Sequence, residues 1–90
     1  MIYLSASYKV KNFKDWHKAF SENESKRLQA GLRVENIFRE NGNPNHLTIL
    51  MSLESLPAAE DYIELITSEE SLQSLSVDGE IEIKYLNVFY

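Results

Sequence analysis

The chain has 90 residues, 43% of them hydrophobic and 11% aromatic, which is enough for one domain with a single modest core. It contains no cysteine, and this excludes a disulfide framework, a thiolate nucleophile and a cysteine-ligated metal site. The formal net charge of −5 disfavours nucleic acid as a partner, because phosphate binding needs a basic surface. We therefore expect a single domain over residues 1–90.

The N-terminal sequence from Met1 to Ser7 lacks the basic segment and long apolar run of a secretion signal. No stretch approaches the roughly 20 apolar residues that a membrane-spanning helix needs. We therefore expect a cytoplasmic protein that has no membrane partner.

The first part of the chain predicts a strand followed by a helix. Apolar and polar residues alternate over 2–10, which is the pattern of a strand with one buried face. Asn12 then has the side chain of a helix N-cap, and apolar residues return at helical spacing until Gly31, so we expect one helix over about 13–30. The apolar residues of this helix are Phe13, Trp16, Phe20 and Leu28.

The middle of the chain predicts a hairpin of two strands. In the segment 32–40 the apolar alternation shifts by one position between Val34 and Ile37, as it does in a bulged strand. The turn-forming segment 41–46 then leads into the mostly apolar segment 47–53, which we expect to be a strand buried on both faces.

The last part of the chain predicts helices and a final strand. Ser55 is a candidate N-cap for a helix over about 56–67, and a short helix follows it. A turn at Asp78-Gly79 would then lead into a strand over 80–90. The resulting order βαββαβ is that of an α+β, ferredoxin-like fold with a four-stranded antiparallel sheet and helices on one face.

The second face of this sheet also carries apolar residues, and the C-terminal segment 86–90 is apolar on both sides. Exposed apolar faces favour a covering layer, and so small a chain has little core of its own. We expect a homodimer that pairs through its sheet faces and its C-terminal strand.

Four short motifs resemble the dimeric α/β-barrel superfamily, and in particular small, mostly uncharacterised relatives of the antibiotic biosynthesis monooxygenase family. The motifs are Val10-x-Asn12-Phe13-x-x-Trp16, Gly31-Leu32-Arg33, Asn43-Pro44 and Leu53-Glu54-Ser55-Leu56-x-Ala58-Ala59. The resemblance implies two ferredoxin-like subunits with their sheets pressed together. It leaves the activity open, because the superfamily also includes polyketide cyclases, haem-degrading enzymes and lactone isomerases.

The haem-degrading branch uses an Asn, a Trp and a His at places that read Ser7, Leu53 and about Leu75 in this chain. We therefore expect no haem. Quinone-type monooxygenases of the superfamily work without metal or flavin, so we expect no cofactor.

The first predicted helix carries the best candidate for catalysis. His17 and Glu24 fall on its apolar stripe with Arg27 beside them, so all three would face a helix–sheet cleft and meet Ser5 and Ser7 there. His17 would act as acid or base near neutral pH. Alternatively, a helix of this length overhangs the sheet and leaves Glu24 and Arg27 in water.

Further candidates for the pocket lining are Trp16, Leu53 and Tyr62, although aromatic and aliphatic residues at these spacings are more often core. The two histidines, His17 and His46, have no metal-binding spacing, so we expect no metal site.

Two classes of function remain open. The first is a cofactor-independent monooxygenase-like or cyclase-like enzyme that acts on a small aromatic or polyketide-like molecule. The second is a non-catalytic dimeric module that binds a small apolar or aromatic ligand or has a structural role. An open cleft with convergent polar groups would favour the enzyme, and a packed cleft would favour the module.

Overall fold

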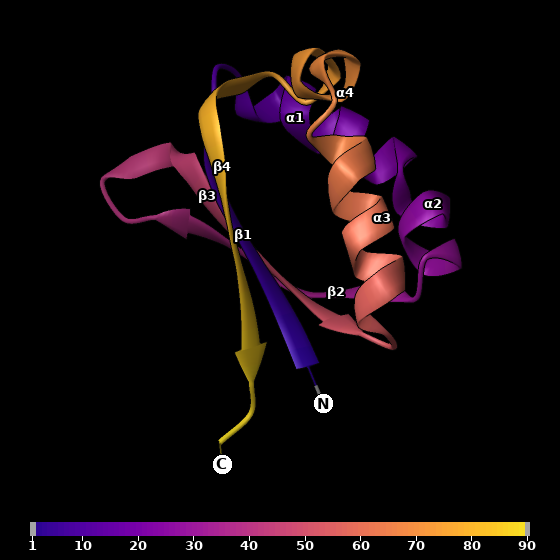
Figure 1. The fold of residues 1–90 in the computed structure, drawn as a ribbon. Coiled ribbons are helices and arrows are strands. Elements are labelled where there is room, and N and C mark those ends of the chain that lie inside the picture. Colours follow the sequence, from indigo (N-terminus) through magenta and orange to yellow (C-terminus); the bar gives the residue numbers. More distant parts are fainter. Residues whose placement is uncertain (1, 90) are drawn as a thin grey trace.

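A computed structural model describes residues 2–89 as a four-stranded antiparallel sheet with helices on one face (Figure 1). The elements are β1 (Ile2–Val10), α1 (Phe13–Glu22), α2 (Glu24–Gln29), β2 (Leu32–Glu40), β3 (Asn43–Leu53), α3 (Leu56–Ile66), α4 (Glu69–Ser74) and β4 (Val77–Asn87). The strand order β2-β3-β1-β4, with every pair antiparallel, confirms the predicted ferredoxin-like subunit.

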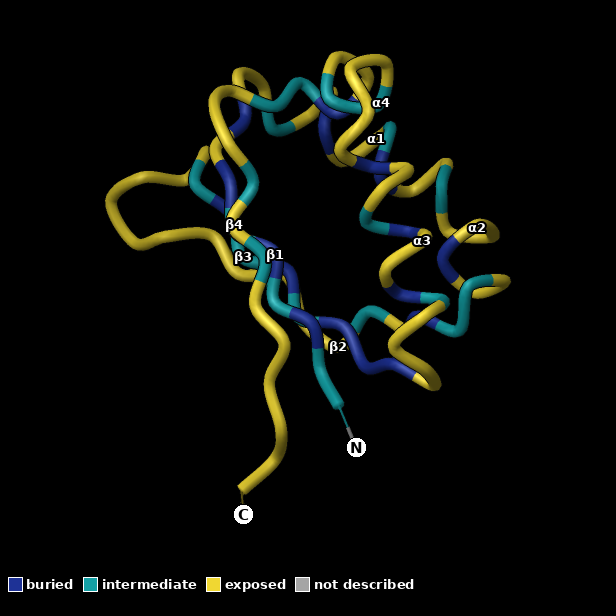
Figure 2. Tube along the Cα trace, in the orientation of Figure 1, coloured by how far each residue is buried: buried dark blue, intermediate teal, exposed yellow. Residues whose placement is uncertain are grey.

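The core lies between the sheet and the helical layer, where Figure 2 shows the buried positions. Along β1 the residues Leu4, Ala6, Tyr8 and Val10 are buried, and the intervening ones are not, which confirms the predicted alternation. The remaining buried apolar residues are Trp16, Phe20, Leu32, Leu47, Ile49, Met51, Leu53, Ala59, Tyr62, Ile66 and Leu75. No helix within residues 2–89 is long and apolar enough to cross a bilayer.

Local capping signals place the starts of two helices correctly. The side chain of Asn12 accepts a hydrogen bond from the backbone N–H of Asp15, and the side chain of Ser55 accepts one from Ala58. These bonds satisfy backbone donors that the first turn of a helix leaves free.

The predicted single helix over 13–30 is wrong, because α1 ends at Glu22, with Asn23 as its C-cap, and a second short helix begins at Glu24. The Asn23 side chain donates a hydrogen bond to the backbone carbonyl of Ala19, a local bond of the kind that competes with a continuous helix. Gly31 then ends α2 as predicted, with a φ of +76° that favours glycine. A Cβ atom at this position would also lie 3.2 Å from Cβ of Glu54.

The predicted bulge in β2 is confirmed, since the register with β3 shifts between Val34 and Asn36. The turn of the hairpin is shorter than the segment 41–46, because Glu40 already pairs with Asn43. The first three residues of β3, 43–45, are exposed. Backbone pairing extends the strand beyond the apolar part that the sequence pattern marked.

The last strand begins at Val77 rather than after Asp78-Gly79. The chain turns earlier, at Ser76, which has a φ of 59°, and Gly79 lies within the strand beside an irregularity in the pairing with β1. The strand ends at Asn87, so Val88 and Phe89 lie beyond it, and both are exposed. Tyr90, which the prediction also included, lies outside the described residues.

Candidate functional site

In the interior between the sheet and the helices, a hydrogen bond joins two buried aromatic residues. The indole Nε1 of Trp16 donates to the phenol oxygen of Tyr8 at 2.7 Å. The Trp16 ring stacks on Phe20, with 4.7 Å between the ring centroids. Burial raises the pKa of Tyr8 well above its usual range, and the hydrogen bond from Trp16 opposes this only in part. The Tyr8 phenol therefore stays protonated at neutral pH.

Arg27 of α2 lies beside this pair and is buried, with only 4% of its surface exposed. Its Nη1 donates to the backbone carbonyl of Phe20 at 2.7 Å, and its Cζ lies 3.7 Å from the centroid of the Phe20 ring. Burial also raises the pKa of Tyr62, while a hydrogen bond and the positive charge of Arg27 act in the opposite direction. Arg27 is thus a buried cation among aromatic side chains.

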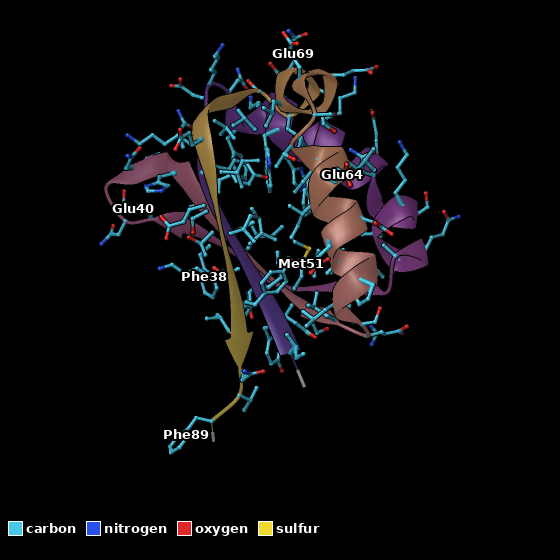
Figure 3. All side chains as sticks on the ribbon, viewed as in Figure 1. Phe38, Glu40, Met51, Glu64, Glu69 and Phe89 are labelled. Carbon is cyan, nitrogen blue, oxygen red and sulfur yellow. The ribbon has the colours of Figure 1, made fainter. Side chains whose placement is uncertain are left out.

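The space left between these interior residues is very small. Tyr8, Arg27, Tyr62 and Met51 border a cavity of about 10 Å³, which is roughly the space of one water molecule. Figure 3 shows the Met51 side chain on the sheet face that looks toward α3. The interior is packed, so it has no room for an organic ligand.

A larger groove of about 250 Å³ opens next to the interior, between α1, α2 and the edge strand β2. Its lining consists of His17, Phe20, Ser21, Glu24, Arg27, Leu28, Leu32, Arg33, Val34 and Ile37. It therefore brings together His17, Glu24 and Arg27, as the helix pattern indicated. His17 and Glu24 are exposed rather than buried, and the His17 ring stacks on Phe13 with 6.0 Å between the centroids.

The placement of Ser5 and Ser7 beside His17 is wrong. They alternate with Leu4, Ala6 and Tyr8, so their side chains lie on the opposite face of the sheet from the helices. The Ser7 hydroxyl is 3.0 Å from the hydroxyl of Thr48 on β3.

The remaining predicted pocket residues do not line the groove that holds His17. Trp16 and Tyr62 are interior residues, and neither lines the groove. Leu53 borders a separate hollow of about 330 Å³ at the edge of the sheet, together with Gly31 and Arg33. Among residues 2–89, no three histidine or acidic side chains gather in a way that could hold a metal ion.

Sequence reasoning missed the pairing of Tyr8 with Trp16, and for Arg27 it left a place facing the helix–sheet cleft and exposure to water as alternatives. The signal for Tyr8 was available, because it shares the alternation of Leu4 and Ala6 and therefore faces the helices. For Arg27 the structure decides between the two alternatives, because the side chain is buried and its Cζ lies over the Phe20 ring.

No protein-family model and no curated protein matches the sequence. Among solved structures, a protein from Bordetella bronchiseptica with the provisional name of antibiotic biosynthesis monooxygenase matches with a TM-score of 0.77 and 14% identity, covering 99% of this chain and 97% of that one. A protein with the same provisional name from Caulobacter crescentus CB15 matches with a TM-score of 0.71 and 17% identity over 99% of this chain and 90% of its own. The chain shares the fold of these proteins.

A conserved protein from Methanosarcina mazei Go1 also matches, with a TM-score of 0.67 and 22% identity over 94% of this chain and 89% of that one. The resemblance to the monooxygenase-like ferredoxin-fold proteins is therefore confirmed at the level of fold. Fold alone does not assign a reaction.

Proposed function

We propose that the protein is a homodimeric module that binds a small aromatic or apolar molecule in the groove between α1, α2 and β2. The observation that carries this proposal is the contrast between a packed interior, with about 10 Å³ of space, and an adjacent groove of about 250 Å³. The groove combines apolar walls from Phe20, Val34 and Ile37 with the polar groups of His17 and Arg27. Small-molecule sites commonly combine apolar walls with a few polar groups in this way.

Trp16 supplies a built-in probe for binding. It is the only tryptophan of the chain, and its ring stacks on Phe20, which lines the groove. Benzyl alcohol, a neutral aromatic probe, should therefore change the Trp16 emission in a saturable way and raise the melting temperature.

A pair of variants tests the location. Ile37→Asp places a charge on the groove wall, at a residue that is 39% exposed, and should abolish the response. Leu65→Asp makes the same change at a residue of α3 that is 47% exposed and is not part of the groove lining, and should leave the response intact. Equal responses from the two variants would place the binding site elsewhere.

The second candidate is a cofactor-independent monooxygenase-like or cyclase-like enzyme, and the position of His17 on the groove favours it. An accessible imidazole can serve as a general acid or base toward a bound molecule. The provisional monooxygenase names of the structural neighbours support the same candidate.

The oxygenase form of this candidate predicts dioxygen uptake with dihydroxynaphthalene above the rate without protein. His17→Gln should abolish the uptake and keep the binding, whereas His46→Gln, in the β3 part of the hairpin, should leave both unchanged. Uptake no faster than in protein-free buffer, or uptake that survives His17→Gln, would count against His17 as the base.

The homodimer is proposed on the open face of the sheet, which the helices leave uncovered. Tyr3, Leu50, Leu86 and Val88 border a hollow of about 460 Å³ on this face. Phe38 is 51% exposed, and Figure 3 shows it on the side of the sheet opposite to Met51. A second copy of the sheet would bury these apolar groups.

Light scattering at micromolar concentration should give twice the mass of one chain. Phe38→Glu should lower this mass, and Leu65→Glu on α3 should not. Removal of the residues after Asn87 should also weaken the dimer, because Val88 is part of the open face. A wild-type protein with the mass of one chain would refute the dimer.

A further inference from the structure

Arg27 is a buried cation without a carboxylate partner. It is 4% exposed, and among residues 2–89 no carboxylate lies within ion-pair distance of its guanidinium. Buried charges in proteins are normally paired, because removing a charge from water is costly. A buried cation that has no anionic partner in its own chain is a candidate to bind an anionic ligand.

The contacts that Arg27 does make are with neutral groups. Nη1 donates to the carbonyl of Phe20, Cζ lies over the Phe20 ring, and the phenol of Tyr62 is close enough for Arg27 to lower its pKa. A guanidinium has five N–H donors in a planar fork that matches a carboxylate. The neutral contacts hold the side chain in place and supply no negative charge to pair with it.

Arg27 also reaches the groove, since it lines both the interior cavity and the groove of about 250 Å³. Arg33 adds a second cation to the groove lining, and Glu24 is its only acidic residue. Phe20, Val34 and Ile37 supply apolar surface next to these charges. The groove is therefore suited to a molecule with an apolar body and one negatively charged end.

We propose that the ligand of this groove is a small aromatic or apolar carboxylic acid, and that Arg27 binds its carboxylate. This inference rests on the proposed binding function and names the class of ligand. The apolar body of the acid would lie against Val34 and Ile37, and its carboxylate would reach the edge of the guanidinium.

The test compares two probes of nearly the same shape, phenylacetate and phenylacetamide, at constant ionic strength. Binding is followed by Trp16 emission and by the thermal shift. We expect phenylacetate to bind at least about tenfold more tightly than the amide, because charge-assisted hydrogen bonds are roughly twice as strong as neutral ones. Equal affinities, or tighter binding of the amide, would overturn the inference.

Arg27→Met removes the charge and keeps most of the apolar stem, and Lys26→Met makes the same change at the exposed neighbouring residue. We expect Arg27→Met to lose at least about tenfold in phenylacetate affinity and Lys26→Met to change it less than about twofold. Unchanged affinity in a folded Arg27→Met protein would overturn the inference. If that variant does not fold, Arg27→Lys replaces it, and the loss of the planar fork should still weaken phenylacetate binding.

The outcomes also separate this inference from the proposed function. Binding of benzyl alcohol without any preference for phenylacetate would leave the binding module intact and refute the role of Arg27. The absence of binding by all three probes would refute both.

Discussion

Replacement of Tyr8 by phenylalanine is the most direct test of the packed interior. The change removes only the hydroxyl that accepts the hydrogen bond from Trp16 Nε1 at 2.7 Å, in a region where both side chains are buried. The indole N–H would then lie in an apolar environment without an acceptor. An unsatisfied buried donor costs about 1–3 kcal/mol.

We expect a loss in the lower half of this range, about 1–2 kcal/mol, because the substitution also removes a polar hydroxyl from the core. For a domain of this size such a loss lowers the melting temperature by about 4–8 °C for each kcal/mol. Tyr85→Phe is the matched control, since Tyr85 is 42% exposed, and its effect should stay within about 0.5 kcal/mol.

The assay is urea unfolding at one fixed protein concentration, because the stability of the proposed dimer would depend on concentration. Circular dichroism should be the primary signal, since the substitution alters the surroundings of Trp16 itself. A loss below about 0.5 kcal/mol with an unchanged denaturant slope would show that the hydrogen bond contributes little to stability.

Three other predictions concern pH, a glycine and a cap. The raised pKa values of Tyr8 and Tyr62 make a contribution to stability that is complete below the ordinary tyrosine pKa of about 10 and is lost as the pH rises above it. The free energy of unfolding should therefore fall in alkali by up to about 1.4 kcal/mol per pH unit for each phenol, and it should fall less steeply in Tyr8→Phe. Gly31→Ala should cost about 1–3 kcal/mol in thermal unfolding and more than Gly42→Ala, because both glycines have positive φ but only Gly31 has atoms close to the new Cβ. Ser55→Ala should cost about 0.5–2 kcal/mol in the same assay through the lost N-cap of α3, and no measurable loss would contradict that role.

The candidate site was only partly predictable from the sequence. The sequence placed residues of one helix relative to one another, but it did not show which strand that helix covers. The helical spacing of His17, Glu24 and Arg27 placed them together, and the structure has all three on one groove. The partner elements were predicted incorrectly, because the groove lies against β2 and Ser5 lies on the other face of β1. Helix periodicity orders residues along one element and does not specify which strand that element covers.

The sequence alone was sufficient to place the features that depend on only a few neighbouring residues. The N-caps at Asn12 and Ser55, the stop at Gly31 and the bulge beside Val34 all depend on neighbouring backbone groups, and the sequence placed them correctly. The order of these elements then determined the ferredoxin-like fold, because few arrangements of βαββαβ bury all the apolar faces.

Only the tertiary structure decided the state of the interior. Whether the helix–sheet space is open depends on how Trp16 packs on Tyr8 and Phe20, which come from two different elements. The burial of Arg27 likewise depends on tertiary packing, in which its guanidinium lies over the Phe20 ring of α1. The volume of a cavity and the burial of a charge depend on many contacts between residues that are far apart in the sequence. A pattern along the chain does not give the distances between those residues.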